Sequence, residues 1–257
     1  MIKWWFALLL LTWQVQANQR VVMTSLNWPP YSGEELIEQG ISVAIAKEAF
    51  AAMGYQLVVE FKPWVRTVTT ASRKAQYIGY FPEYYFDTQE FVFSDPIGRG
   101  PLGLVENTQS PIRWSTLSDL TQYRVGTVKG YVNTPEFDQM VASGSLTVEE
   151  TLDDLRNVYK VAKGRLDAAV IDANVLDFLI RRDSRSVLLS KRLRMNPTLL
   201  AEKDLFLAFN NSEEGRKWRD IFNQGLAKID PLAIAASVQK RQQEPGNVTQ
   251  LPVADKR

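Results

Sequence analysis

The chain has 257 residues, with 30 basic and 29 acidic side chains and neither cysteine nor histidine. Without these two residue types there are no disulfides, no thiol nucleophile, no histidine-based triad, and none of the usual zinc ligands except carboxylates. Histidine is also the commonest general acid–base group, so the composition favours binding over catalysis, and we expect neither a metal nor a cofactor. The balanced charge gives no indication of a nucleic acid partner.

The N-terminus has the outline of a secretory signal peptide. Lys3 precedes an apolar run from Trp4 to Leu11, and a small-residue cleavage pattern ends at Ala17. The run is shorter than the about 20 residues that a membrane-spanning helix needs. An uncleaved anchor and a buried first helix are the alternatives. We expect residues 1–17 to be a cleaved signal peptide, and the mature protein to be a soluble periplasmic monomer.

The first hundred residues predict alternating strands and helices. Ligands in such mostly parallel α/β sheets bind beyond the carboxyl ends of strands, where Trp28, Trp64 and Phe81 fall. Trp28 is followed by two prolines, which cannot continue a sheet, so its loop is expected to leave the sheet there. The predicted strands cover 20–26, 55–61 and 77–81, and the predicted helices cover 40–54 and 65–75.

A second unit repeats this alternation and precedes a tail without periodicity. Together the two units predict an α/β protein of two lobes, each a mostly parallel sheet flanked by helices, with a cleft between them. From residue 242 onward the chain is expected to be disordered. The predicted strands cover 123–128, 146–148, 167–171 and 205–210, and the predicted helices cover 134–141, 152–163, 173–181 and 213–227.

Five segments stand in the order and spacing of a known family. They are Trp28-Pro29-Pro30-Tyr31, the helix GISVAIAKEAFAAMGY from Gly40, FSDPI from Phe93, VGTVKG from Val125, and KGRLDAAVID from Lys163. Together they resemble bacterial extracellular solute-binding proteins of family 3, the periplasmic receptors for polar amino acids. The resemblance covers about residues 20–240.

The resemblance implies the type II periplasmic binding protein fold, in which the chain crosses between the lobes twice. Lobe 1 would hold residues 18–103 and 200–241, lobe 2 would hold 104–199, and 242–257 would be the tail. The crossings are expected near 98–105 and 196–201. The lobes would close around a small polar molecule by a hinge motion and deliver it, without covalent chemistry, to an inner-membrane ABC permease or a sensor.

The family's two charged ligand contacts are only half present in this chain. An arginine clamps the ligand carboxylate in these receptors, and an acid from the second lobe receives the ammonium. Asp172, at the end of the strand over 167–171, matches the acid, and capping the next helix is its alternative role. The arginine is missing, because no basic residue occurs from Ala75 to Gly98, and Asp87 stands near its expected place.

Two explanations of the missing arginine stay open. Arg66 or Arg99 would supply the clamp from another direction, although each also suits a plain surface charge. Alternatively the ligand is an amine without a carboxylate, which Glu83, Asp87 and Asp172 would favour. Cation–π contacts would then add about 0.5–2 kcal/mol each. Both explanations predict an amine-bearing ligand, either an amino acid or a related amine.

The segment GYFPEYYFDTQEFVFSDPI, from Gly79 to Ile97, carries seven aromatic residues and four acids. Strand alternation requires part of it to pack as core, whereas Phe81 and Tyr84 are expected beyond the strand's end, so it is predicted to be both core and pocket. After the second lobe's first strand, Gly130 and Tyr131 would offer backbone N–H groups if a helix followed directly. The predicted ligand contacts, each with packing or a surface position as its alternative, are Trp28, Tyr31, Trp64, Arg66, Tyr80, Phe81, Tyr84, Arg99, Gly130, Tyr131 and Asp172.

Two other functions fit the same sequence. Enzymes of the dehydratase type share this fold, and Glu83 or Asp87 among aromatic residues would there act as a general acid. A ligand-sensing protein that is not coupled to import is the third hypothesis.

Overall fold

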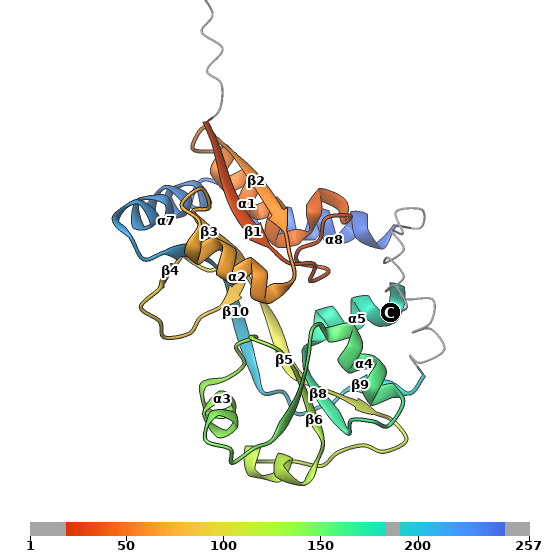
Figure 1. Cartoon of the computed structure of the whole chain (residues 1–257). Helices are drawn as coiled ribbons and strands as arrows, with labels where there is room; N and C mark the ends of the chain where they lie inside the picture. Colours follow the sequence, from red (N-terminus) through yellow and green to blue (C-terminus); the bar gives the residue numbers. More distant parts are fainter. Residues whose placement is uncertain (1–18, 183–190, 245–257) are drawn as a thin grey trace, which may run out of the picture.

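The protein has two α/β lobes joined by two long strands (Figure 1). The structure, a computed structural model, describes residues 19–182 and 191–244. The predicted signal peptide and nearly all of the predicted tail lie outside these ranges. Within them, no helix is both long enough and apolar enough to cross a membrane.

The first lobe is built on a parallel sheet. β1 (Gln19–Ser25) pairs with β2 (Tyr55–Phe61) over seven residue pairs and with β3 (Gly79–Tyr84) on its other side. The apolar strand residues pack against the buried face of α1 (Ile41–Ala51). The helix α7 (Glu213–Leu226) lies so close to α1 that a Cβ on its Gly225 would be 2.0 Å from the Ala49 carbonyl oxygen. The helices of this lobe are α1 (Ile41–Ala51), α2 (Trp64–Arg73), α7 (Glu213–Leu226) and α8 (Pro231–Gln243), with a short 3-10 helix at Ile37–Gln39.

The second lobe repeats the parallel arrangement. β6 (Val125–Val128) lies between β7 (Val148–Thr151) and β8 (Ala168–Asp172) and pairs in parallel with both. The helices start where capping residues predict them, since Thr134 and Asp153 accept backbone N–H groups of the first turns of α3 and α4. This lobe contains α3 (Pro135–Ala142), α4 (Asp154–Ala162), α5 (Ala173–Arg182), β9 (Leu193–Met195) and a 3-10 helix at Leu117–Gln122.

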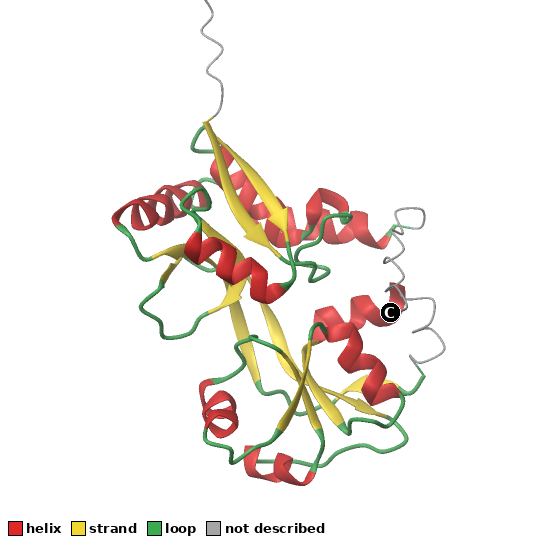
Figure 2. Cartoon of the chain, viewed as in Figure 1, coloured by secondary structure: helices red, strands yellow, loops and turns green. Residues whose placement is uncertain are grey.

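Two ten-residue strands run from one lobe into the other (Figures 1 and 2). β5 (Gly98–Asn107) and β10 (Ala201–Asn210) pair antiparallel near the middle of the molecule. Further along, β5 pairs with β8 and β9, while β10 pairs with β3 and with β4 (Phe91–Phe93). The strand order is therefore β2-β1-β3-β10-β5-β8-β6-β7. The crossings predicted near 98–105 and 196–201 fall on β5 and just before β10.

The strand β3 and the helix α8 differ from the sequence prediction. β3 continues through Pro82 to Tyr84, so Phe81 and Tyr84 lie inside the strand and not beyond it. Pro82, which cannot donate a backbone hydrogen bond, sits beside the register irregularity between β3 and β10. The helix α8 was not predicted, and it includes Gln242 and Gln243, the first two residues of the expected disordered tail.

Candidate functional site

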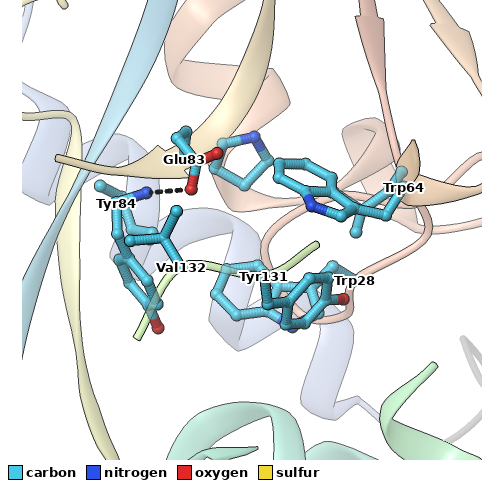
Figure 3. Close-up of a pocket in the computed structure, with 9 residues that line it drawn as sticks. Trp28, Trp64, Glu83, Tyr84, Tyr131 and Val132 are labelled. Carbon is cyan, nitrogen blue, oxygen red and sulfur yellow. Dashed lines mark hydrogen bonds between the residues drawn. The ribbon is translucent and has the colours of Figure 1, made fainter. Parts of the chain in front are cut away.

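A small cavity lies between the lobes, at the carboxyl ends of several strands (Figure 3). The volume of this cavity is about 20 Å³, which is room for about one water molecule. The lobes are therefore closed against each other, with side chains filling most of the cleft. The lining residues are Leu26, Trp28, Trp64, Pro82, Glu83, Tyr84, Tyr131, Val132 and Leu205.

Two tryptophans of lobe 1 and a tyrosine of lobe 2 form the aromatic part of the site. Trp28 lies on the loop after β1, and Trp64 begins α2 directly after Pro63. The ring of Tyr131 reaches in from the second lobe, with centroids 6.4 Å from Trp28 and 5.5 Å from Trp64, and meets both edge-on. Edge-to-face packing of this kind is favourable for aromatic pairs. Tyr131 therefore packs against both tryptophan rings of the other lobe.

Hydrogen bonds also connect the lobes directly. Trp64 Nε1 donates to the Gly130 carbonyl oxygen at 2.7 Å. The Tyr31 hydroxyl donates to the Asp172 carboxylate at 3.2 Å, and the Tyr84 hydroxyl donates to it at 3.3 Å. The predicted role of backbone N–H groups after Gly130 is not seen, because α3 begins only at Pro135 and the Gly130 carbonyl makes the contact. These bonds stabilise the closed arrangement.

Asp172 caps the next helix, which is one of the two roles that the sequence left open. It ends β8, is 1% exposed, and accepts the backbone N–H groups of Asn174 at 2.8 Å and Val175 at 3.2 Å, which caps α5. The same carboxylate faces the phenols of lobe 1. Burial raises the pKa of Asp172 to about 6, although these hydrogen bonds act in the opposite direction.

The hinge strand β5 runs directly past this carboxylate. A Cβ on Gly100 would lie 1.9 Å from Oδ2 of Asp172 and 2.4 Å from the Tyr31 hydroxyl. Only glycine therefore lets the Asp172–Tyr31 contact form where the chain crosses between the lobes.

Glu83 is a second buried acid, from the end of β3. Its Oε1 accepts the backbone N–H of Tyr84 at 2.8 Å, as Figure 3 shows, and its Oε2 accepts the Tyr80 hydroxyl at 3.1 Å. Burial raises the pKa of Glu83 to about 8. The nearby Lys203 opposes this shift weakly, and its ammonium lies 5.2 Å from the centre of the Tyr84 ring.

Asp154 is a third buried acid, which sequence reasoning missed. It lies at the start of α4, just beyond the carboxyl end of β7, and its Oδ2 accepts the Tyr131 hydroxyl at 3.2 Å. Burial, with smaller contributions from Asp153 and Asp172, raises its pKa to about 7. The available signal was its position after a strand, but Asp153-Asp154 reads as a helix start and only Asp153 serves as the cap.

The other predicted contacts are spread over the core and the surface. Tyr80 is fully buried, with its ring 5.6 Å from that of Trp64, whereas Phe81 packs in the core and does not line the cavity. Arg66 is on the exposed side of α2. The side chain of Arg99 is 71% exposed and lies 3.3 Å from Asp204.

Glu83 is the acid that lines the cavity, whereas Asp154 and Asp172 lie behind the tyrosines that they accept hydrogen bonds from. Asp87, the residue near the expected place of the clamp arginine, is exposed. Among the described residues, no arginine lines the cavity, and no group of three or more carboxylates is arranged to hold a metal ion.

Known proteins show what this chain is similar to. No protein family model and no curated protein matches it. A histidine kinase sensor domain with similarity to periplasmic binding proteins superimposes with a TM-score of 0.73 at 15% identity, over 88% of this chain and 96% of that one. The ligand-binding core of GluR0 from Nostoc punctiforme, in complex with L-glutamate, gives a TM-score of 0.68 at 18% identity, over 88% and 100% of the two chains.

A transport protein belongs to the same group of similar structures. An amino acid ABC transporter substrate-binding protein from Streptococcus pneumoniae, bound to L-arginine, gives a TM-score of 0.69 at 13% identity, over 88% of this chain and 97% of that one. At such identities the likeness establishes the fold. The chain has the two-lobe periplasmic binding protein fold, which confirms the predicted fold class.

Proposed function

We propose that this protein is a periplasmic solute-binding protein that captures a small polar, amine-bearing molecule between its lobes and delivers it to a membrane transporter. The observation that carries the proposal is the cleft itself, where three buried carboxylates meet aromatic rings from both lobes. A buried carboxylate without a charged partner costs several kcal/mol. A ligand ammonium would supply the missing partner and would be held by both lobes at once.

The position of these groups explains why ligand binding and closure would be coupled. Asp172 and Asp154 belong to lobe 2, whereas Glu83, Trp28 and Trp64 belong to lobe 1. A ligand that contacts both sets stabilises only the closed form, and a ligand shifts an equilibrium by its difference in affinity for the two states. No covalent step is needed for this function.

Delivery to a transporter and sensing differ in the partner and share the same cleft. The structures with this fold include a substrate-binding protein of an ABC transporter and a histidine kinase sensor domain. Either partner would recognise the ligand-bound, closed form, and the transporter is the partner proposed here.

A thermal-shift screen of amino acids, polyamines and related amines tests the proposal. A specific ligand raises the midpoint of unfolding because it binds the folded state, by RT ln(1 + [L]/Kd). Asp172→Asn should lose the shift, and Asp87→Asn, at an exposed acid, should keep it. A screen without any stabilising amine would overturn the proposal. Conversion of the stabilising amine into a product, lost in Glu83→Gln, would favour the enzymatic alternative.

A further inference from the structure

We propose that the ligand is a linear dication without a carboxylate, such as a diamine or a decarboxylated basic amino acid. One cationic end lies at Glu83, and the other lies at Asp154 and Asp172. This inference rests on the proposed function and specifies its ligand class.

A row of aromatic rings connects the acids of the two lobes. Glu83 accepts the hydroxyl of Tyr80, whose ring lies 5.6 Å from that of Trp64. The ring of Tyr131 in turn lies 5.5 Å from that of Trp64, and its hydroxyl donates to Asp154. Asp172 lies close enough to Asp154 to raise its pKa. The cleft therefore offers one carboxylate on the lobe 1 side and two on the lobe 2 side, with aromatic surface between them. That arrangement suits a molecule with a cation at each end and methylene groups in the middle.

Within the described residues, the three carboxyl groups accept hydrogen bonds from neutral donors and form no ion pair. Glu83 accepts one phenol and one backbone N–H, Asp154 accepts the Tyr131 phenol, and Asp172 accepts phenols and backbone N–H groups. A buried acid either pairs with a cation or holds a proton, and burial raises the pKa of all three. A ligand ammonium would replace the proton as their positive partner.

The base near Glu83, Lys203, does not favour a ligand carboxylate. Lys203 is half-buried, and burial lowers its pKa. Its charge already interacts with three acids: Glu83, together with Glu136 and Asp138 of lobe 2. A ligand carboxylate would add one more negative charge to a region where acids outnumber bases, and no arginine fork is present to hold it in two hydrogen bonds.

The aromatic rings complete the recognition of a dication. The faces of Trp28 and Trp64 offer apolar contact for methylene groups and cation–π attraction for an ammonium, worth about 0.5–2 kcal/mol each. Because Tyr131 stands between these rings in the closed structure, entry of the ligand requires the lobes to separate and this ring to move aside.

Calorimetric titration with matched pairs tests the inference. The pairs are arginine and agmatine, lysine and cadaverine, and ornithine and putrescine, whose members differ only in the α-carboxylate. We expect the decarboxylated member of at least one pair to bind at least about tenfold more tightly than its amino acid, a difference of about 1.4 kcal/mol. Equal or tighter binding of the amino acids would overturn the inference and leave the proposed function intact. Binding by neither class would count against both.

Variants with matched ligands locate the two ends. Asp154→Asn should weaken cadaverine at least about tenfold and leave pentylamine, which has one ammonium, within about twofold. Glu83→Gln serves as a second variant, should Asp154→Asn fail to fold, and Asp87→Asn is the control. Equal losses for cadaverine and pentylamine in both variants would contradict a two-ended site.

Discussion

Two glutamates of this protein are buried to a similar degree, but their hydrogen-bond partners differ in number and in charge. Glu106, on β5, is 0% exposed, and its carboxylate receives Arg194 Nε at 2.7 Å, Asn196 Nδ2 at 2.8 Å and the Ile112 backbone N–H at 3.0 Å. Glu83 is 5% exposed and receives one phenol and one backbone N–H. The first has a cation and a full set of donors, whereas the second forms no ion pair with any described residue.

The two glutamates differ in partners because one lies inside lobe 2 and the other lies at the cavity between the lobes. Glu106 fastens β9 and the loop after β5 inside lobe 2, so its charge is neutralised within the chain. Glu83 faces the cleft, where any cation supplied by the chain would compete with the ligand's own. A protein that binds a cation between its lobes has reason to leave these acids unpaired, at a cost to its stability without ligand.

The largest expected loss of stability follows from removing the cation that pairs with Glu106. Arg194→Met removes the cation from Glu106 and leaves a buried carboxylate, so unfolding in urea should show a loss of about 3 kcal/mol. The control is Arg99→Met, which breaks an exposed pair with Asp204 and should cost less than about 1 kcal/mol. Equal losses in the two variants would show that Glu106 does not depend on Arg194.

The unpaired glutamate should appear in the pH dependence of stability. The pKa of Glu83 in the folded protein, about 8, lies above its ordinary value of 4.5, so between these values the folded state holds a proton that the unfolded chain has released. Stability should therefore be greatest below about pH 4.5 as far as this group is concerned, and should fall as pH rises through 8. Glu83→Gln should make the fall from pH 6 to pH 8 shallower by about 2 kcal/mol. Parallel curves for variant and wild type would contradict the shift.

A smaller effect is expected at the crossing strand. Gly100→Ala places a methyl group against Asp172 and Tyr31, which should prevent their contact and weaken ligand binding about tenfold in calorimetry. Gly98→Ala, on the same strand, is the matched control, because a Cβ there meets nothing within 4 Å. If both variants bind like the wild type, the Asp172–Tyr31 contact is not part of the binding-competent state.

The smallest effect is expected for one bond between the lobes. Trp64→Phe keeps an aromatic ring and removes the donor to the Gly130 carbonyl, so the closed form should lose about 1 kcal/mol. The variant should show a larger radius of gyration in solution scattering without ligand. Trp218→Phe, whose indole bonds within α7 to Glu214, should scatter like the wild type. An unchanged radius in Trp64→Phe would mean that this bond does not hold the lobes together.

Local sequence patterns predicted most of the lobes but less of the site. The strand and helix alternation predicted two α/β lobes, and the resemblance to solute-binding proteins of family 3 implied how the chain crosses between them. The proline-rich loop indicated Trp28 because Pro29 and Pro30 cannot continue a sheet. Asp172 was predicted from its place at the end of an apolar strand. These are features of neighbouring residues, which a single sequence displays directly.

The rest of the site depends on contacts between distant segments. Asp154 is buried because Tyr131 and Trp28 cover it, and one of these comes from the other lobe. β3 extends past Pro82 because β10, more than a hundred residues later, pairs with its end. Arg66 and Arg99 are basic residues next to predicted strand ends, and only the folded chain shows that both are exposed.

A crystal structure of the protein with the amine that stabilises it most would show whether a ligand ammonium binds the buried acids between the lobes. We expect density in the cleft between Trp28 and Trp64, with an ammonium nitrogen about 3 Å from a carboxylate oxygen of Glu83, Asp154 or Asp172. An amine bound outside the cleft, or one whose nitrogen points to solvent while these three acids keep only their present partners, would contradict it.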